Sequence, residues 1–206
     1  MAGAFPINNS AFETLGIKSL QNTILTKSIN GKKLSRQVDN QRFGFTARII
    51  TAKRSDVYGE LMAFIMKQRS SKENFTIIPP EVKSTRGSET QVVSVNGSHT
   101  AGDNTIAMDG FGADGAGRFK AGDLIKFASH TKIYMIVEDV TSSSNASTVT
   151  IEPPLINALA DDEVVTYNNV PFTVHLTNDI QEFGAVGADK DGNLLYEFEL
   201  DVEEAI

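Results

Sequence analysis

The sequence of 206 residues predicts a mainly β protein with one helix, in which the two ends of the chain form a β-sandwich and a small antiparallel β-barrel is inserted between them. Three observations predict this fold class. A strand, an amphipathic helix and a second strand follow one another over residues 41–82. Short β-prone runs separated by turn clusters fill residues 83–168, and longer alternation resumes after Asn169. We therefore expect one domain from residues 1–82 and 169–206, and an inserted domain from residues 83–168.

The first part of the sandwich is predicted from the periodicity of apolar residues. A strand with one buried face is indicated by the alternating residues Phe43, Phe45, Ala47 and Ile49. A helix over about residues 55–68, with Ser55 as its N-cap, is indicated by the spacing of Val57, Leu61, Phe64 and Ile65. A return strand at residues 75–78 ends at Pro79-Pro80, because proline donates no ladder hydrogen bond.

The N-terminal residues before this unit are weakly patterned until a hairpin signal appears. Residues 1–22 are expected to form an arm or an irregular leading strand. Asn30-Gly31 lies between two β-prone runs, Thr23–Lys27 and Leu34–Val38, and predicts a hairpin. The hairpin carries the basic residues Lys27, Lys32, Lys33 and Arg36. A solvated loop is the alternative interpretation of this segment.

Six short strands are predicted in the middle of the chain, and together they favour a small barrel or sandwich. They are Gln91–Val95, Thr105–Met108, Leu124–Phe127, Lys132–Val137, Ser147–Ile151 and Glu163–Tyr167. The glycine-rich stretch Asp109–Gly117 lacks the Gly-Lys-Ser/Thr ending of a phosphate-binding loop, so we interpret it as a mobile loop between strands.

The C-terminal strands alternate clearly, and one of them has an acidic flank. Phe172, Val174 and Leu176 share one face of the first strand. In the last strand, Leu194, Tyr196, Phe198 and Leu200 alternate with a set that includes the carboxylates Glu197, Glu199 and Asp201. The segment Asp189–Asn193 predicts a hairpin turn. A calcium loop is the weaker alternative, because leucine stands where that loop needs glycine and glutamate, at Leu194 and Leu200.

Charge is divided unevenly along the chain. Residues 1–86 hold 14 Lys and Arg against 6 Asp and Glu, and residues 87–206 hold 5 against 20, which together give the net charge of −7. This division is compatible with nucleic-acid binding, with two solvated surfaces, or with copies that attract one another. A direct nucleic-acid role is disfavoured because the basic residues form no dense run with exposed aromatics.

Composition argues against several other classes of protein. The chain has no cysteine, which excludes disulfides and thiolate metal sites. We find no apolar run long enough for a membrane span and no signal-peptide pattern, so we expect a soluble protein. No nucleophile elbow or acid–base pair is present, and His99, His130 and His175 lack ligand spacing and are expected at the surface or in strands. We therefore expect no enzyme, no metal and no cofactor.

Several segments resemble bacteriophage tail-hub and distal tail proteins. The strand–helix–strand run Arg42–Val82 looks like their N-terminal part. The blocks Phe119–Phe127, His130–Ile136 and Ile151–Leu155 are similar to their β-barrel insertion. The resemblance implies a tail-tube-like β-sandwich flanked by an α-helix. It also implies a structural virion protein, made in the host cytoplasm, that forms a ring, usually hexameric, at the distal tail or baseplate hub.

The same resemblance implies partners and roles for particular residues. The partners are further copies of the chain, the neighbouring tail-tube and baseplate or tip proteins, and DNA that passes through without specific binding. Glu197, Glu199 and Asp201 are candidates for facing the lumen, where they would repel phosphate. Lys27, Lys32, Lys33 and Arg36 are candidates for contacts between subunits.

Two other functions stay open from the sequence. One is a β-rich module that recognises a host surface polysaccharide, for which the aromatic candidates are Phe111, Phe119, Phe127, Tyr134 and Tyr167. The other is a ring protein of the neck or tail terminator. A hydrolase is a more remote third reading, with no residues that favour it.

Overall fold

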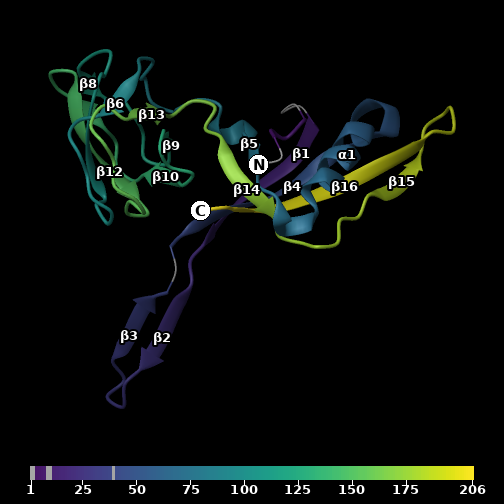
Figure 1. Cartoon of the computed structure of the whole chain (residues 1–206), viewed down its shortest axis with the longest axis horizontal. Helices are drawn as coiled ribbons and strands as arrows, with labels where there is room; N and C mark the ends of the chain where they lie inside the picture. The colour runs from purple at the N-terminus through teal and green to yellow at the C-terminus, as the bar shows by residue number, and fades with distance from the viewer. Residues whose placement is uncertain (1–2, 8–10, 39) are drawn as a thin grey trace. The chain divides into compact units, whose positions relative to one another are not determined.

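The computed structural model describes residues 3–7, 11–38 and 40–206 of the chain (Figure 1). These residues fold into two compact units. The sheet unit takes in the chain up to Lys18, then Phe43–Lys83 and Asn169–Ile206. The barrel unit takes in Ser19–Arg42 and Ser84–Asn168. The predicted N-terminal arm includes residues 1, 2 and 8–10, which lie outside the described residues.

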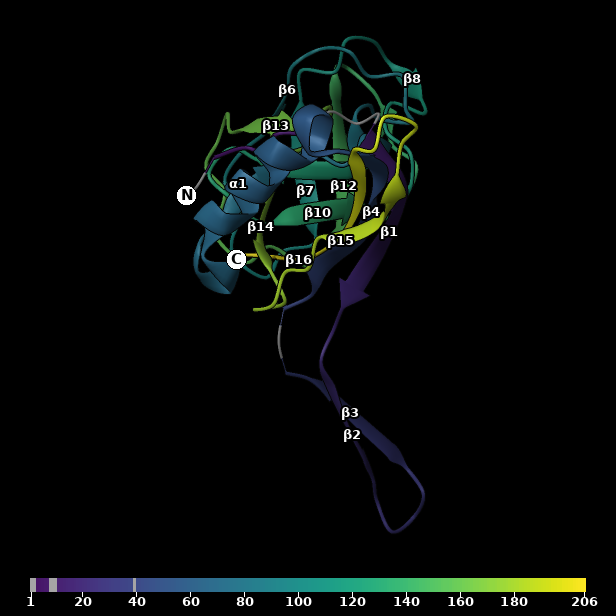
Figure 2. The same cartoon turned by 90° about the vertical axis from the view of Figure 1, so that its right-hand side faces the viewer.

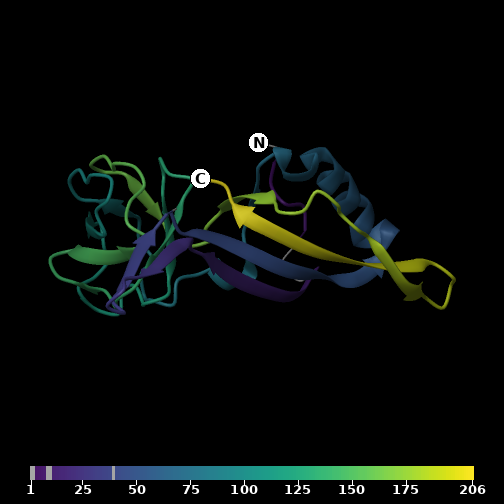
Figure 3. The ribbon, with the colours of Figure 1, turned by 90° about the horizontal axis from the view of Figure 1, so that it is seen from below.

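A six-stranded sheet forms most of the sheet unit, and its long strands run side by side in Figure 3. The strand order is β1-β4-β16-β14-β5, and β15 also pairs with β16. The bounds are β1 Phe12–Leu20, β4 Arg42–Lys53, β5 Phe75–Ile77, β14 Phe172–Leu176, β15 Gly184–Ala188 and β16 Leu194–Glu204. The helical segments are η2 Arg54–Tyr58, α1 Gly59–Gln68, η3 Ser70–Lys72 and η4 Pro80–Val82.

The predicted alternation sets which face of this sheet is buried. In β4 the four apolar residues Phe43, Phe45, Ala47 and Ile49 are all buried. Across the ladder to β16, Phe45 pairs with Val202, Ala47 with Leu200 and Ile49 with Phe198. Because directly opposite residues share a face, both strands contribute to one core. Helix α1 packs over this face and forms the second layer of the unit (Figure 1).

The helix begins differently from the prediction. Residues 54–58 form a π-helical turn before α1, and Ser55 Oγ donates to Asp56 Oδ1 without capping the helix. The turn moves the buried position by one residue, so Tyr58 is buried in place of Val57. Its hydroxyl donates to the carbonyl of Ile50 at 3.0 Å. The predicted N-cap at Ser55 was therefore wrong, whereas Leu61 and Ile65 are buried as expected.

The two chain connections at the end of β5 and the start of β14 lie side by side. The Asn169 N–H donates to the Lys83 carbonyl at 3.1 Å, and the Val170 N–H donates to the Val82 carbonyl at 3.4 Å. Both connections belong to the sheet unit. The chain therefore leaves this unit for residues 84–168 and returns from them at one place.

A closed barrel of six antiparallel strands forms most of the barrel unit (Figure 2). The strand order around it is β10-β12-β7-β6-β13-β9. The bounds are β6 Val93–Val95, β7 Thr105–Asp109, β9 Leu124–Phe127, β10 Ile133–Ile136, β12 Ala146–Glu152 and β13 Val164–Thr166. A separate pair is formed by β8 Gly115–Ala116 and β11 Thr141–Ser142. The fold class is confirmed: the protein is mainly β, with one α-helix and a small antiparallel barrel.

The predicted hairpin is present as an independent two-stranded sheet, labelled β2 and β3 in Figure 1. β2 spans Thr23–Lys27 and β3 spans Lys33–Gln37, and Gly31 in the turn has a positive φ of 76°. Every residue of both strands is exposed. The hairpin therefore has neither a buried face nor a third strand within the described chain.

Candidate interaction surfaces

The acidic row of β16 lies on the outer face of the sheet, where two of its three carboxylates have cationic partners. Arg48 of β4 forms an ion pair with Glu197 and contacts Glu13 of β1 at 3.2 Å. Lys18 of β1 forms an ion pair with Asp201 at 2.8 Å. Each of these two carboxylates thus meets a basic side chain from another strand of the sheet. In this row, Glu197 and Asp201 are paired with cations, and the Glu199 carboxylate is not.

Asp201 is the most strongly held member of the row. Its carboxylate accepts hydrogen bonds from Lys18 at 2.8 Å, Thr46 Oγ1 at 3.0 Å and Thr177 Oγ1 at 2.8 Å. Burial opposes its ionisation, but the three hydrogen bonds outweigh this effect and lower the pKa of Asp201 below its ordinary value. Asp201 is therefore a structural residue that ties β1, β4 and the end of β14 to β16.

Glu199, between these two, lies opposite Arg48 in the ladder, but its exposed carboxylate has no hydrogen-bond or ion-pair partner within the described part of the chain. Glu182, in the loop between β14 and β15, is likewise exposed and has no such partner within those residues. Both residues line two neighbouring hollows of about 390 and 340 Å³. Ile180, which is 86% exposed, lines one of them. We call this surface the acidic hollow; it presents two unpaired carboxylates beside an exposed apolar side chain.

The pairing of β2 with β3 places the four basic hairpin residues on different faces. Lys27 lies directly opposite Lys33, whereas Arg36 lies opposite Ile24 on the other face. Lys32 lies in the turn, where its N–H donates to Ser28 Oγ at 3.2 Å. The structure therefore brings Lys27, Lys32 and Lys33 together at the tip and separates Arg36 from them. No acidic residue lies between Ser19 and Val38.

The opposite face of the hairpin is apolar and uncovered. The register places Ile24 and Leu34 on the same face as Arg36, and Val38 continues that face beyond the strand. The exposed fractions of these side chains are 58%, 52% and 58%. Leu25, on the basic face, and Ile29, in the turn, are exposed as well.

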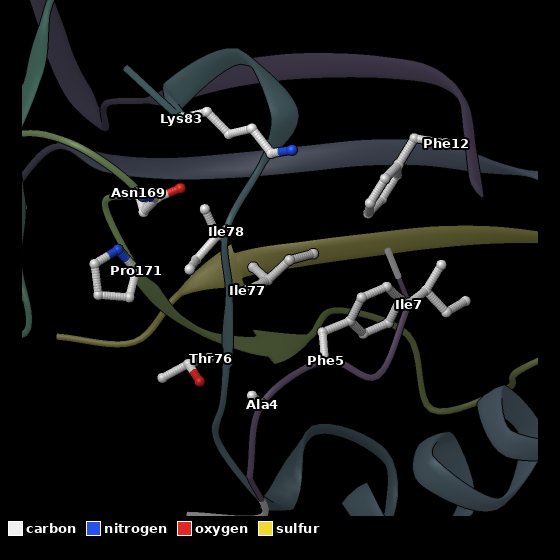
Figure 4. A pocket seen from close by; sticks show the side chains of 10 residues that line it. All are labelled: Ala4, Phe5, Ile7, Phe12, Thr76, Ile77, Ile78, Lys83, Asn169 and Pro171. Atoms are coloured by element: carbon white, nitrogen blue, oxygen red, sulfur yellow. The ribbon is translucent and has the colours of Figure 1, made fainter. Parts of the chain in front are cut away.

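A groove lies beside β5, and Figure 4 shows the apolar side chains Phe5, Phe12, Ile77 and Ile78 around it, with polar residues also in its lining. Its volume is about 500 Å³. The N-terminal segment forms one wall, because the Phe5 N–H donates to the Thr76 carbonyl at 2.8 Å and the Thr76 N–H donates to the Gly3 carbonyl at 3.0 Å. This edge of the sheet is thus occupied by the chain itself. At the other end of the strand order, β1 has only β4 as a neighbour among the described strands.

The barrel does not present the aromatic residues that a sugar-binding surface would need. Each of the five candidates is buried: Phe111, Phe119, Phe127, Tyr134 and Tyr167. All five make ring contacts with one another, with Phe111 on Phe119, Phe119 on Tyr167 and Phe127 on Tyr134. They fill the barrel core, so the polysaccharide alternative loses the residues on which it depended.

The glycine-rich loop is anchored on both sides, contrary to its interpretation as mobile. The Gly112 N–H donates to the Glu89 carboxylate at 3.3 Å, and β8 within the loop pairs with β11. Asp114 accepts hydrogen bonds from the N–H groups of Ser144 and Asn145 at 2.9 and 2.8 Å. The loop is therefore held in place by hydrogen bonds to Glu89, to β11 and to the turn at Ser144 and Asn145.

The histidines and the Asp189 turn do not form a metal site. No group of three or more histidine, aspartate or glutamate side chains that could hold a metal occurs among the described residues. His130 was predicted at the surface or in a strand, but it is buried in a loop, with Nδ1 2.8 Å from the Tyr134 hydroxyl. Asp189 forms an ion pair with Lys53 and accepts the N–H groups of Asp191 and Asn193, both at 2.9 Å. The hairpin turn is therefore confirmed.

Sequence reasoning missed several of the residues that shape these surfaces. Glu182 carries no periodic signal and is placed beside Glu199 only by the path of its loop. Lys18 and Glu13 belong to the nine-residue strand β1, in a segment for which the sequence indicated an arm or an irregular leading strand without placing its residues. Among the described helices, none is long and apolar enough to cross a membrane.

The fold and these surfaces define a mainly β protein that combines an open sheet, a closed barrel and an uncovered basic hairpin. Residues 81–170 match the family model described as distal tail protein pb9, B domain. This match confirms the resemblance to bacteriophage distal tail proteins over residues 81–170 and indicates a structural role in a phage tail. No curated protein matches the sequence in a direct search.

Proposed function

We propose that this protein forms a ring, most simply a hexamer, at the distal end of the tail, where it connects the tail tube to the tip and lets DNA pass. The match of residues 81–170 to a distal tail protein domain supports the location. In this proposal, the partners are further copies of the chain, the tail tube on one side and baseplate or tip proteins on the other.

The observation that carries the ring is the open edge of β1. This strand is nine residues long, almost entirely exposed, and includes the exposed apolar residues Ile17 and Leu20. An uncovered edge strand offers backbone N–H and C=O groups to another chain. A contact between two different surfaces of identical copies closes into a ring when its rotation allows closure. Copies that complete the β1 edge of their neighbours would meet this condition.

The two units have separate roles in the proposal. Residues 1–82 and 169–206 form the tail-tube-like lobe that builds the ring, and residues 83–168 form an inserted domain that faces neighbouring proteins. The buried aromatics of the barrel favour a protein-contact role for this domain over polysaccharide binding. DNA passage requires a lumen that does not bind phosphate. Of the predicted lumen-facing carboxylates Glu197, Glu199 and Asp201, only Glu199 keeps an uncompensated charge.

The experiment is a measurement of mass and shape on the purified full-length chain. Size-exclusion chromatography with light scattering should give a defined multiple of 22.3 kDa. Negative-stain images should show closed rings with a central opening. A protein that stays monomeric at high concentration in both measurements contradicts the proposal. Labelling of intact virions with an antibody to the chain then tests the position, which should be the distal end of the tail.

A further inference from the structure

The exposed hairpin needs a partner surface. A lone two-stranded hairpin is only marginally stable in water, and this one leaves Ile24, Leu34 and Val38 uncovered on one face. On the other face, Lys27 lies opposite Lys33, and like charges directly across a ladder repel each other. Leu25 lies on this second face and is 60% exposed, so an acidic surface with an apolar component would relieve the repulsion and cover that side chain.

The acidic hollow of the sheet unit has these properties. Glu182 and Glu199 are exposed carboxylates without partners within the described chain, whereas the nearby Glu197 and Asp201 are already paired with Arg48 and Lys18. The hollow also contains Ile180, an exposed apolar side chain. Its two unpaired carboxylates suit lysine side chains, which are strongly hydrated point charges on flexible stems.

We propose that the β2–β3 hairpin of one copy docks on the acidic hollow of a second copy, with Lys27 and Lys33 facing Glu182 and Glu199. The occupant is a second copy because the hairpin holds four basic residues and no acidic one, which complements the hollow in charge. The inference rests on the proposed ring and names a second contact between its subunits, in addition to the β1 edge. Each copy contributes a donor hairpin and an acceptor hollow, and such contacts between unlike surfaces can close a ring.

A charge-swap experiment in the full chain tests this contact. Variant A carries Lys27→Glu and Lys33→Glu, and variant B carries Glu182→Lys and Glu199→Lys. Each variant alone should lose rings, because hairpin and hollow then have the same sign. An equimolar mixture should recover rings in which A and B alternate, and a chain with all four changes should recover them alone. Lys67→Glu and Glu60→Lys, exposed changes on helix α1, are the matched controls and should keep wild-type rings.

The mixture separates docking between copies from docking within one copy. If the hairpin docks on its own chain, the fourfold variant recovers rings but the mixture of A and B does not, which overturns the proposal. If A and B both form wild-type rings alone, the contact does not exist, although the ring itself stands. If the wild type forms no ring, the proposed function fails first. If Glu199 instead faces the lumen, variant B should form intact rings and only genome passage should change. That result would also overturn the contact.

Cross-linking gives a second readout that does not depend on ring formation. The chain contains no cysteine, so Lys33→Cys and Glu199→Cys introduce single thiols without background. Mixed in equal amounts with a short bis-maleimide, the two variants should yield mainly a hetero-cross-linked dimer, identified by mass spectrometry of the linked peptides. Lys190→Cys in place of Lys33→Cys should not link. Absence of the Lys33–Glu199 link, with efficient labelling of both thiols, would overturn the contact.

Discussion

Arg118 donates from Nε to the Oε2 atom of Glu89 at 3.0 Å, and Glu89 is only 2% exposed. The same carboxylate accepts the N–H groups of Gln91 at 2.7 Å, Thr90 at 2.8 Å and Gly112 at 3.3 Å. This buried ion pair thus joins the segment before β6 to the glycine-rich loop. The position of the loop therefore depends on this ion pair.

Removal of one partner should destabilise the barrel. Glu89→Gln leaves the Arg118 guanidinium without its counter-charge, which typically costs about 3 kcal/mol for a buried pair. Chemical denaturation followed by circular dichroism measures the loss. Glu152→Gln, at an exposed glutamate of β12, is the control and should change the unfolding free energy by less than about 0.5 kcal/mol. Equal stability of the two variants would contradict the structural role of the pair.

The same carboxylate should make stability fall in acid. Burial opposes ionisation of Glu89, but the N–H of Gln91, the Arg118 side chain and the other backbone donors outweigh it and lower its pKa. A lowered folded-state pKa stabilises the protein above the unfolded-state value of about 4.3, and this contribution is lost as pH falls through the folded-state pKa. Wild-type stability between pH 5 and pH 2 should therefore decline more steeply than that of Glu89→Gln.

Gly59 should resist replacement although it lies at the start of a helix. A Cβ there would lie 2.8 Å from the Arg54 carbonyl oxygen, because the π-helical turn brings that oxygen close. Gly59→Ala should cost about 1–3 kcal/mol, whereas this change usually stabilises a helix. Thermal unfolding measures the difference. Gly187→Ala, where the added Cβ meets nothing within 4 Å, should be close to neutral.

Replacement of Asp201 should lower the stability of the protein, whereas replacement of Glu199 should not. Asp201→Asn weakens the hydrogen bonds from Lys18, Thr46 and Thr177, and should lower the unfolding free energy by about 1–2 kcal/mol. Glu199→Gln, which loses no partner within the described chain, should leave stability unchanged. Denaturant unfolding of the two variants provides the comparison. A Glu199→Gln protein that is as destabilised as Asp201→Asn would show that the outer face has a different organisation.

The Asp189–Lys53 pair should be visible by titration. Hydrogen bonds from Lys53 and Asn193 hold the pKa of Asp189 well below its usual range. Lys53→Met should raise this pKa toward the ordinary value, as measured from the carboxyl carbon shift by NMR. Lys190→Met, a neighbouring lysine in the same turn, should leave it in place. In the wild type, the pair stabilises the turn above the unfolded-state pKa of about 3.9, and this contribution fades as pH falls below it.

The sequence predicted the elements whose burial follows a strict period. The alternation of Phe43, Phe45, Ala47 and Ile49 identified β4, because one face of that strand is buried and the other is not. The six barrel strands were recognisable for a related reason: turn residues separate them at short intervals. The helix was found, but its first turn was not, since a π-helical turn changes the period from which a helix is recognised.

The strands that the sequence placed least clearly are β1 and β15, which have no buried face. β1 is exposed along nearly its whole length, and β15 is built from the small residues of Gly184–Ala188, so neither shows alternation. The ion pairs of the outer face depend on cross-strand register, which a single sequence does not specify. The position of Glu182 beside Glu199 depends on the path of a loop. The acidic hollow therefore became visible only in three dimensions.

The hydrogen bonds that join Lys83 to Asn169 and Val82 to Val170 have an evolutionary consequence. To the sheet unit, everything between these residues is equivalent to a single loop with fixed ends. Insertions, deletions or exchanges within residues 84–168 can then occur while the strand order of the six-stranded sheet is kept. Recombination at this junction would exchange residues 84–168 without redesign of the sheet that carries them.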